Sequence, residues 1–304
     1  MSLETQVYEE RRRKWRRSAF WKGVFVTLGL IIAAVAALVM LADDRPAGPH
    51  IARFFVDGII YDDPSRDALL AEIDANPDVR ALIIRINSPG GTTAGSEALH
   101  DAIRDIAEDI PVVAVMGEVA ASGGYITAIA ADQIFALGNT TTGSIGVIME
   151  YPDVTSLMET LGVEMQTIRS SDIKGGPSPF RELTDDARLA QEAMVDEAFD
   201  WFKSLVADRR ELSENQINAV ANGGVFSGRQ AVENGLIDAL GGEDEALEYL
   251  ESLAPALSVI PVETWELPPE DTGLLGYFGV NLRTNPLFEA LSADSGPRLY
   301  SLKR

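Results

Sequence analysis

Runs of β-branched and aromatic residues alternate with amphipathic segments through the first half of the chain, and this alternation constrains the fold most. The predicted strands cover residues 51–60, 81–87, 111–116 and 133–137, and the predicted helices cover residues 65–76, about 93–108, and a segment that ends near 132. Strands and helices that alternate in this way predict an α/β fold with a parallel sheet and crossover helices. Functional residues of such folds lie at the carboxyl ends of the strands.

Beyond residue 184 the pattern becomes helical. Apolar residues recur at helical spacing over residues 185–210, which predicts one long helix. Ser213 and Gln216 form a capping box for a helix that ends at Asn222 and Gly223, and Ser227 caps a short helix that stops at Gly235. Residues 243–253 form the last clear helix.

An uncharged run of 20 residues, 23–42, lies near the amino end. At ~1.5 Å per residue a helix of this length crosses the ~30 Å hydrocarbon core of a bilayer. Seven Lys and Arg precede it within residues 1–22, and Asp43 and Asp44 follow. The basic flank predicts a cytoplasmic amino end, a single transmembrane helix, and a main domain outside the cytoplasm.

Two other interpretations of residues 23–42 remain open. A cleaved signal peptide is one, although the run exceeds the usual apolar region of ~7–15 residues and lacks an Ala-x-Ala end. A buried core helix is the other. With the anchor, the predicted organisation is a basic cytoplasmic segment (1–22), a transmembrane helix (23–42), a linker (43–50), an α/β domain (51–258) and a C-terminal extension (259–304).

Composition excludes several kinds of chemistry. The chain has no cysteine and two histidines, so thiolate nucleophiles and cysteine zinc sites are impossible and a histidine-rich metal site has little support. The net charge of -22 argues against a nucleic-acid partner, because phosphate contacts need clustered Lys and Arg. We expect neither a metal nor a nucleotide cofactor.

Two glycine-rich loops follow predicted strands. In residues 87–91 (NSPGG), paired glycines allow backbone N–H groups to face a ligand; the alternative is an ordinary tight turn. In residues 117–125 (GEVAASGGY), Ser122 lies where a helix begins, beside the positive end of its dipole. The Gly123 amide could bind an oxyanion, as in strand–turn–helix nucleophile elbows. A plain N-cap serine is the alternative.

A nucleophilic serine needs a base, and few candidates exist. His50 adjoins the linker, and His100 is expected on the solvated part of a helix. Beyond residue 50 the chain has three lysines, of which Lys203 and Lys303 suit solvated positions. Lys174 lies in a loop of small residues and proline, where it is either a base or an ordinary exposed charge. A further loop, residues 142–147 (TGSIGV), offers the hydroxyl of Ser144 or is simply a small-residue turn.

Five motifs, taken in order, resemble the bacterial signal peptide peptidases of the SppA family, which are serine–lysine proteases. They are INSPGG, GEVAASGGY, TGSIGV, a lysine before PSPFRELT, and VFSGRQAVENGLIDALGG, within residues 51–253. The resemblance implies a crotonase-like, Clp-protease-like fold. It implies that Ser122 is the nucleophile, that Lys174 is the general base, and that Ser144 orients the lysine. It also implies that Gly91 and Gly123 supply the N–H groups of an oxyanion hole.

One motif departs from the family, which often has Gly-x-Tyr-Lys around the base, whereas this chain has Ser171-Asp172-Ile173-Lys174. Ile173 would help to exclude water from the amine, and Asp172 would oppose this if it faced the amine.

The resulting prediction is a membrane-anchored serine endopeptidase that cleaves apolar peptides such as remnant signal peptides. The resemblance implies a bacterial inner-membrane protein with its catalytic domain on the periplasmic side, assembled as a homo-oligomer. The long helix and the apolar tail residues offer interface material; the latter are Leu274, Leu275, Tyr277 and Phe278. A crotonase-type acyl-thioester enzyme and a catalytically silent scaffold are the alternatives.

Overall fold

Most of the described chain belongs to one unit, Ala47–Leu267. The structure, a computed structural model, describes residues 15, 20–33 and 48–267. Residues 15 and 20–33 belong to the second unit, which comprises Met1–Pro46 and Pro268–Arg304. The apolar tail residues 274–278 lie outside the described residues.

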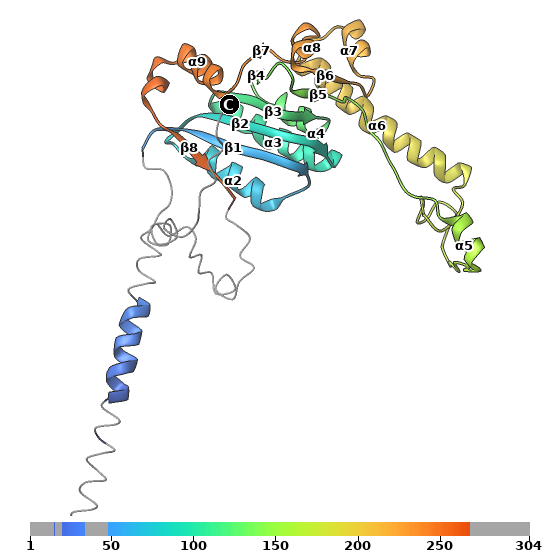
Figure 1. Ribbon diagram of the computed structural model, residues 1–304, viewed down its shortest axis with the longest axis horizontal. Coiled ribbons are helices and arrows are strands. Elements are labelled where there is room, and N and C mark those ends of the chain that lie inside the picture. Colours follow the sequence, from blue (N-terminus) through green and yellow to red (C-terminus); the bar gives the residue numbers. More distant parts are fainter. Residues whose placement is uncertain (1–14, 16–19, 34–47, 268–304) are drawn as a thin grey trace, which may run out of the picture. The chain divides into compact units, whose positions relative to one another are not determined.

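A single sheet forms the frame of the larger unit (Figure 1). Its main path runs β6-β5-β3-β2-β1-β8, and β4 pairs with β3 and β7. Every pairing is parallel except β5 with β6, which confirms the predicted parallel sheet. The strands are β1 (His50–Ile60), β2 (Val79–Gly91), β3 (Val112–Ala121), β4 (Gln133–Ala136), β5 (Thr141–Gly143), β6 (Val225–Ser227), β7 (Ala239–Leu240) and β8 (Val262–Trp265).

Helices cover both faces of this sheet. The larger core packs side chains of β1, β2 and β3 against α2 (Pro64–Ala75), α3 (Thr93–Asp109) and α4 (Gly123–Ala128). On the opposite face, α9 (Glu243–Leu253) packs Ala246 and Leu250 against alternate residues of the same strands. The remaining helices of this unit are α5 (Thr155–Leu161), α6 (Asp185–Arg209), α7 (Glu214–Val220), α8 (Gly228–Glu233) and the 3-10 helix η1 (Pro255–Val259).

Helix termini follow the local sequence closely. The predicted helices 65–76, 93–108, 185–210 and 243–253 match α2, α3, α6 and α9 to within one residue at each end. The predicted capping box at Ser213 and Gln216 opens α7, and a second one at Ser227 opens α8. Both boxes satisfy amides that the first turn of a helix leaves without partners.

Several segments that were not predicted as strands belong to the sheet, including the short strands β5, β6 and β7. β2 continues through the Ser88–Gly91 motif because Ile59 and Ile60 of β1 pair with its glycines, and β3 continues to Ala121. The sheet also extends beyond the predicted domain end at residue 258. There η1 leads the chain to β8, which pairs with β1 and buries Trp265.

The two histidines are buried, so the expectation of a solvated His100 is wrong. His50 opens β1, and its Nε2 accepts a hydrogen bond from Trp265 Nε1 at 3.2 Å. His100 lies on the inner side of α3, with Nδ1 3.0 Å from Asp101 Oδ1 and no partner for its buried Nε2 in the described part of the chain. Burial lowers the pKa of His100; Asp101 opposes this, and Arg209 and Arg104 add to it.

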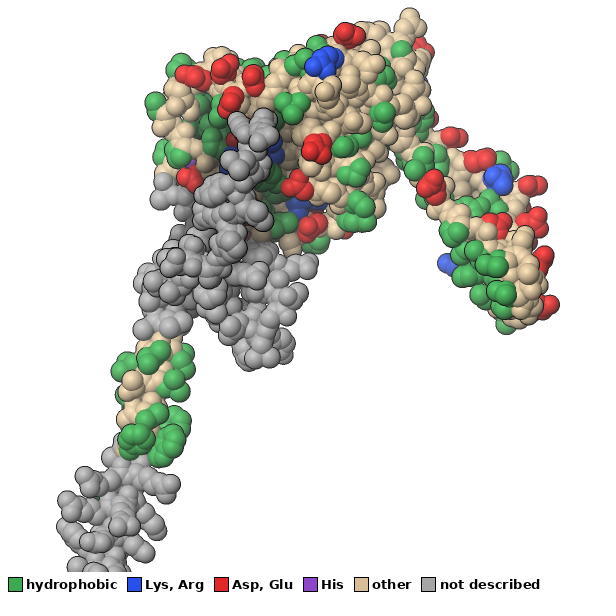
Figure 2. Space-filling model, in the orientation of Figure 1, with side chains coloured by type: hydrophobic (Ala, Val, Ile, Leu, Met, Phe, Trp, Pro, Cys, Tyr) green, Lys and Arg blue, Asp and Glu red, His purple; other side chains and the backbone are tan. Residues whose placement is uncertain are grey.

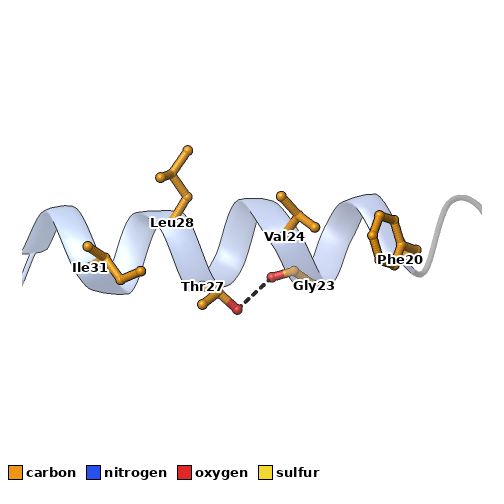
Figure 3. A pocket seen from close by; sticks show the side chains of 6 residues that line it. All are labelled: Phe20, Gly23, Val24, Thr27, Leu28 and Ile31. Carbon is orange, nitrogen blue, oxygen red and sulfur yellow. Dashed lines mark hydrogen bonds between the residues drawn. The ribbon is translucent and has the colours of Figure 1, made fainter.

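Residues 20–33 form a helix whose side chains are exposed. An open pocket along this helix is lined by Phe20, Gly23, Val24, Thr27, Leu28 and Ile31, and Thr27 Oγ1 donates to the Gly23 carbonyl at 3.0 Å (Figure 3). Among the residues that the structure describes, no helix is long and apolar enough to cross a membrane. Residues 34–42 of the predicted span lie outside the described residues.

Acid should destabilise the fold through His100. The folded state disfavours the charged ring, so the unfolded chain binds more protons below the ordinary pKa of about 6.5, and stability is lost as pH falls from there towards the lowered pKa. Between about pH 7 and pH 5, we expect the melting temperature of His100→Leu to fall less on acidification than that of the unmodified protein. Parallel melting-temperature curves for the two proteins would contradict this.

Candidate active site

Ser122 occupies a strained turn between β3 and α4. Its φ of 53° and ψ of −116° are unusual for a residue with a side chain and cost about 1–3 kcal/mol. Three backbone hydrogen bonds hold the turn: Ser122 N donates to Gly143 O, and Ser122 O accepts from the amides of Tyr125 and Ile126, all at 2.9 Å. The side chain makes no capping hydrogen bond, so the plain N-cap interpretation fails.

Glycines bring the end of β2 against this turn. A Cβ on Gly90, whose φ is 116°, would lie 2.9 Å from Ser122 Cβ and 3.0 Å from the Gly123 amide nitrogen. A Cβ on Gly123 would lie 3.0 Å from the Gly91 amide nitrogen and would overlap Ser96 Oγ. Gly91 and Gly123 therefore lie side by side, next to Ser122. The first amides of a helix such as α4 have no intrahelical acceptor and are available to an anion.

Ser144 follows β5 and faces the same cavity as Ser122. It also has a positive φ, 51°, and its amide donates to Gly224 O at 2.8 Å. The Gly223 amide donates to Ile145 O at 3.0 Å, and this hydrogen bond continues the antiparallel ladder of β5 and β6. The loop of residues 142–147 is thus tied to β6 and presents its hydroxyl at a defined place.

The cavity has a volume of about 250 Å³. Its polar side comprises small residues, and its apolar side comprises Ile126, Val147, Ile148, Trp201 and Phe202. Trp201 and Phe202 were not predicted as site residues, because their helix, α6, lies far from Ser122 along the chain. Ser96, in the first turn of α3, was not predicted as a site residue either. The complete lining is Gly91, Thr93, Ser96, Ser122, Gly123, Ile126, Ser144, Gly146, Val147, Ile148, Trp201, Phe202 and Gly223.

Lys174 does not line this cavity. It is exposed in a turn between α5 and α6, and its backbone carbonyl accepts from Arg181 Nη2 at 3.2 Å. Asp172 pairs with Arg169 at 3.0 Å, and Ile173 is about half exposed. In Figure 1, α5 and the start of α6 project away from the sheet. The structure therefore brings Gly91, Ser122, Gly123 and Ser144 together and leaves Lys174 apart.

The two histidines do not line the cavity either. Among the described residues, no cluster of three or more His, Asp or Glu side chains could hold a metal ion.

Ser122 lies between a strand and a helix, the position that a nucleophile elbow gives its serine. Sequence comparisons specify the class of protein. Residues 55–143 match the Clp protease family, which agrees with the parallel sheet and its crossover helices. Residues 104–256 match Peptidase family S49. The two matches overlap in the segment that contains Ser122.

Individual relatives agree with these families. A Synechocystis protein named as a protease is 36% identical over 206 residues, which are 67% of this chain and 74% of that protein. A protein of the same description from Methanocaldococcus jannaschii is 33% identical over 250 residues, 76% of this chain and 80% of the relative. An Enterococcus faecium protein named as a signal peptide peptidase SppA is 36% identical over 182 residues, 60% of this chain and 53% of the relative.

The chain belongs to peptidase family S49. It is an SppA-like serine peptidase.

Proposed function

We propose that Ser122 is the nucleophile of an endopeptidase, with Gly91 and Gly123 as the donors of its oxyanion hole. The observation that carries this proposal is the uncapped Ser122, held at a positive φ in a cavity beside two glycines. Strain of this kind persists only where surrounding contacts enforce it, and it is concentrated at functional sites. Nucleophile elbows on other α/β enzymes use the same strand–turn–helix position.

The reaction follows from these positions. Ser122 Oγ attacks the carbonyl carbon of the peptide bond and gives its proton to a base, and the amides of Gly91 and Gly123 donate to the developing oxyanion. The base returns the proton to the leaving amine, which departs as the C–N bond breaks. Water then attacks the acyl ester and restores the Ser122 hydroxyl. Removing one oxyanion donor in such sites lowers turnover by roughly 10²–10³-fold.

Lys174 is the base that we propose, and Ser144 is the hydroxyl that orients it. A lysine accepts a proton only in its neutral form, which an apolar, water-poor surrounding favours. Lys174 is exposed in the single chain, so the dyad needs a further contact that covers the amine. Asp172 leaves the lysine free for this role because its carboxylate pairs with Arg169.

A second copy of the chain provides that contact in our proposal. The segment around α5 has no buried helix residue and exposes many apolar side chains, beside acidic ones (Figure 2). Contiguous apolar surface on a soluble domain marks an interaction site. The exposed apolar residues of this segment are Leu157, Leu161, Val163, Met165, Ile168, Ile173 and Phe180. Docking of this segment on a neighbouring copy would bring Lys174 to that copy's Ser122.

The apolar side of the cavity supports apolar peptides as substrates. Ile126 and Phe202 are buried there, and Trp201 is partly buried. A space of about 250 Å³ with this lining favours a single apolar side chain next to the cleaved bond. Remnant signal peptides are the natural peptides of this kind, and one relative is named as a signal peptide peptidase.

We also propose that residues 23–42 anchor the enzyme in a bacterial inner membrane, with the catalytic domain on the periplasmic side. The run is uncharged, and its described part, up to residue 33, is helical with exposed apolar side chains. The basic residues before it favour a cytoplasmic amino end. An anchored site would meet apolar peptides at the surface of the bilayer.

The dyad predicts a specific pattern of inactive variants. Ser122→Ala and Lys174→Ala should each abolish cleavage of an apolar peptide while melting temperature and assembly are retained. The double variant should be no worse than either single variant, because the two groups act as one unit. Lys174→Arg should also be inactive, since guanidinium does not deprotonate in this range. Near-normal turnover by Lys174→Arg would exclude the lysine as a base.

Mixing the two inactive proteins tests where the dyad forms. Ser122→Ala chains and Lys174→Ala chains, dissociated together and reassembled, should regain part of the cleavage activity, because an intact Ser122 then meets an intact Lys174 from another copy. Each variant reassembled alone is the control. Mixed assemblies, verified by two chain labels, that stay inactive would mean that both groups come from one chain.

Protease treatment of spheroplasts tests the membrane orientation. Added protease should degrade residues 50–304 and spare a tag at the amino end, since the basic flank stays inside. A main domain that is protected until the membrane is lysed would overturn the orientation. A mature chain that begins at Asp43 would instead identify a cleaved signal peptide.

A further inference from the structure

The first turn of α3 packs between the end of β1 and the Ser122 turn. Thr92 precedes the helix; its amide donates to Ile60 O at 2.9 Å, and its Oγ1 accepts from Gly95 N at 3.2 Å. On one side, a Cβ on Gly95 would lie 2.7 Å from the amide nitrogen of Asp62. On the other side stands Ser96, which faces Gly123. The turn therefore has little room to shift in either direction.

Ser96 is fully buried, and its hydroxyl oxygen has a defined place. Ser96 Oγ donates to Thr92 O at 2.9 Å. A Cβ on Gly123 would overlap this oxygen and would lie 3.0 Å from the Gly91 amide nitrogen. Gly123 therefore packs closely against two groups, the Ser96 hydroxyl and the Gly91 amide.

A serine in a helix commonly donates to the carbonyl of the preceding turn, so this hydrogen bond alone implies no function. Here, however, Thr92 O already accepts from the Ser96 amide at 3.0 Å, as in any helix. The carbonyl does not need the hydroxyl as a partner. The hydroxyl instead fills the space between α3 and Gly123.

We infer that Ser96 is a positioning residue of the oxyanion hole: its hydroxyl, fixed on Thr92, sets the separation of the Gly91 and Gly123 amides. The inference rests on the proposed role of these amides. Loss of the hydroxyl leaves a gap into which either backbone can move. A misplacement of about 1 Å in such a site lowers turnover by roughly 10²-fold.

Kinetics of Ser96→Ala in the full-length protein, with an apolar peptide substrate, test the inference. We expect kcat to fall by roughly 10- to 100-fold, with KM changed less than about twofold, because the loss falls on the transition state. The matched control is Ser252→Ala, which removes a serine hydroxyl that donates to Tyr249 O on α9, away from the cavity. Unchanged kcat in Ser96→Ala would overturn the inference.

The inhibition constant of a reversible peptide aldehyde distinguishes a positioning role of Ser96 from a merely structural one. The adduct of the aldehyde with a serine has a tetrahedral carbon and an oxygen in the oxyanion position. The inhibition constant of Ser96→Ala should rise by about the same factor as kcat/KM falls, at an unchanged melting temperature. An inhibition constant that stays the same while kcat falls would also overturn the inference.

A double-mutant cycle covers the case in which Ser96→Ala folds poorly. Gly123→Ala should lower the melting temperature strongly in the unmodified protein, because the new Cβ meets Ser96 Oγ, and less in the Ser96→Ala background. Equal losses in the two backgrounds would refute the contact. This measurement needs no activity, so it separates the inference from the proposed function, which fails if Ser122→Ala still cleaves peptide.

Discussion

The close approach of backbone segments at glycine positions is the constraint on which the site depends. The end of β2 lies directly against the Ser122 turn, and a Cβ on Gly124 would lie 2.7 Å from Ser88 O. On its other side β2 meets β1, where a Cβ on Gly91 would overlap the Ile60 carbonyl. Because no side chain fits between these segments, their amides lie next to the cavity. Any larger residue would separate the strand from the turn.

Two strained serines depend on one another through the sheet. Ser122 and Ser144 both have positive φ values, which disfavour side chains because Cβ crowds the backbone. The Ser122 amide donates to Gly143 O. Ser144 directly follows Gly143, and its amide donates to Gly224 O. Thr142 adds a hydrogen bond from its hydroxyl to Ala120 O at 2.6 Å. The antiparallel strand β6, far along the chain, thereby stabilises the turn that carries Ser122.

Local pattern predicted the elements well and their contacts poorly. Strands β1 to β4 and the long helices followed from periodicity and capping residues, whereas the short strands β5, β6 and β7 were not expected. The Ser88–Gly91 segment looked like a turn because its glycines and proline disfavour strands, yet pairing with β1 makes it a strand. His100 looked solvated because only its own helix was considered. Trp201, Phe202 and Ser96 carry no local signal, since their place in the cavity arises from tertiary packing.

The position of Lys174 links the proposed chemistry to assembly. In the single chain Lys174 is exposed and does not line the cavity of Ser122, so the proposed dyad does not form there. A contact that buries the lysine amine against apolar side chains would disfavour the charged form of the amine. The same contact would bring the amine towards a serine. The same contact would cover the apolar residues around α5 that one chain leaves exposed. The free energy gained by covering them would thus help to remove water from the amine, and cleavage would be confined to the assembled enzyme.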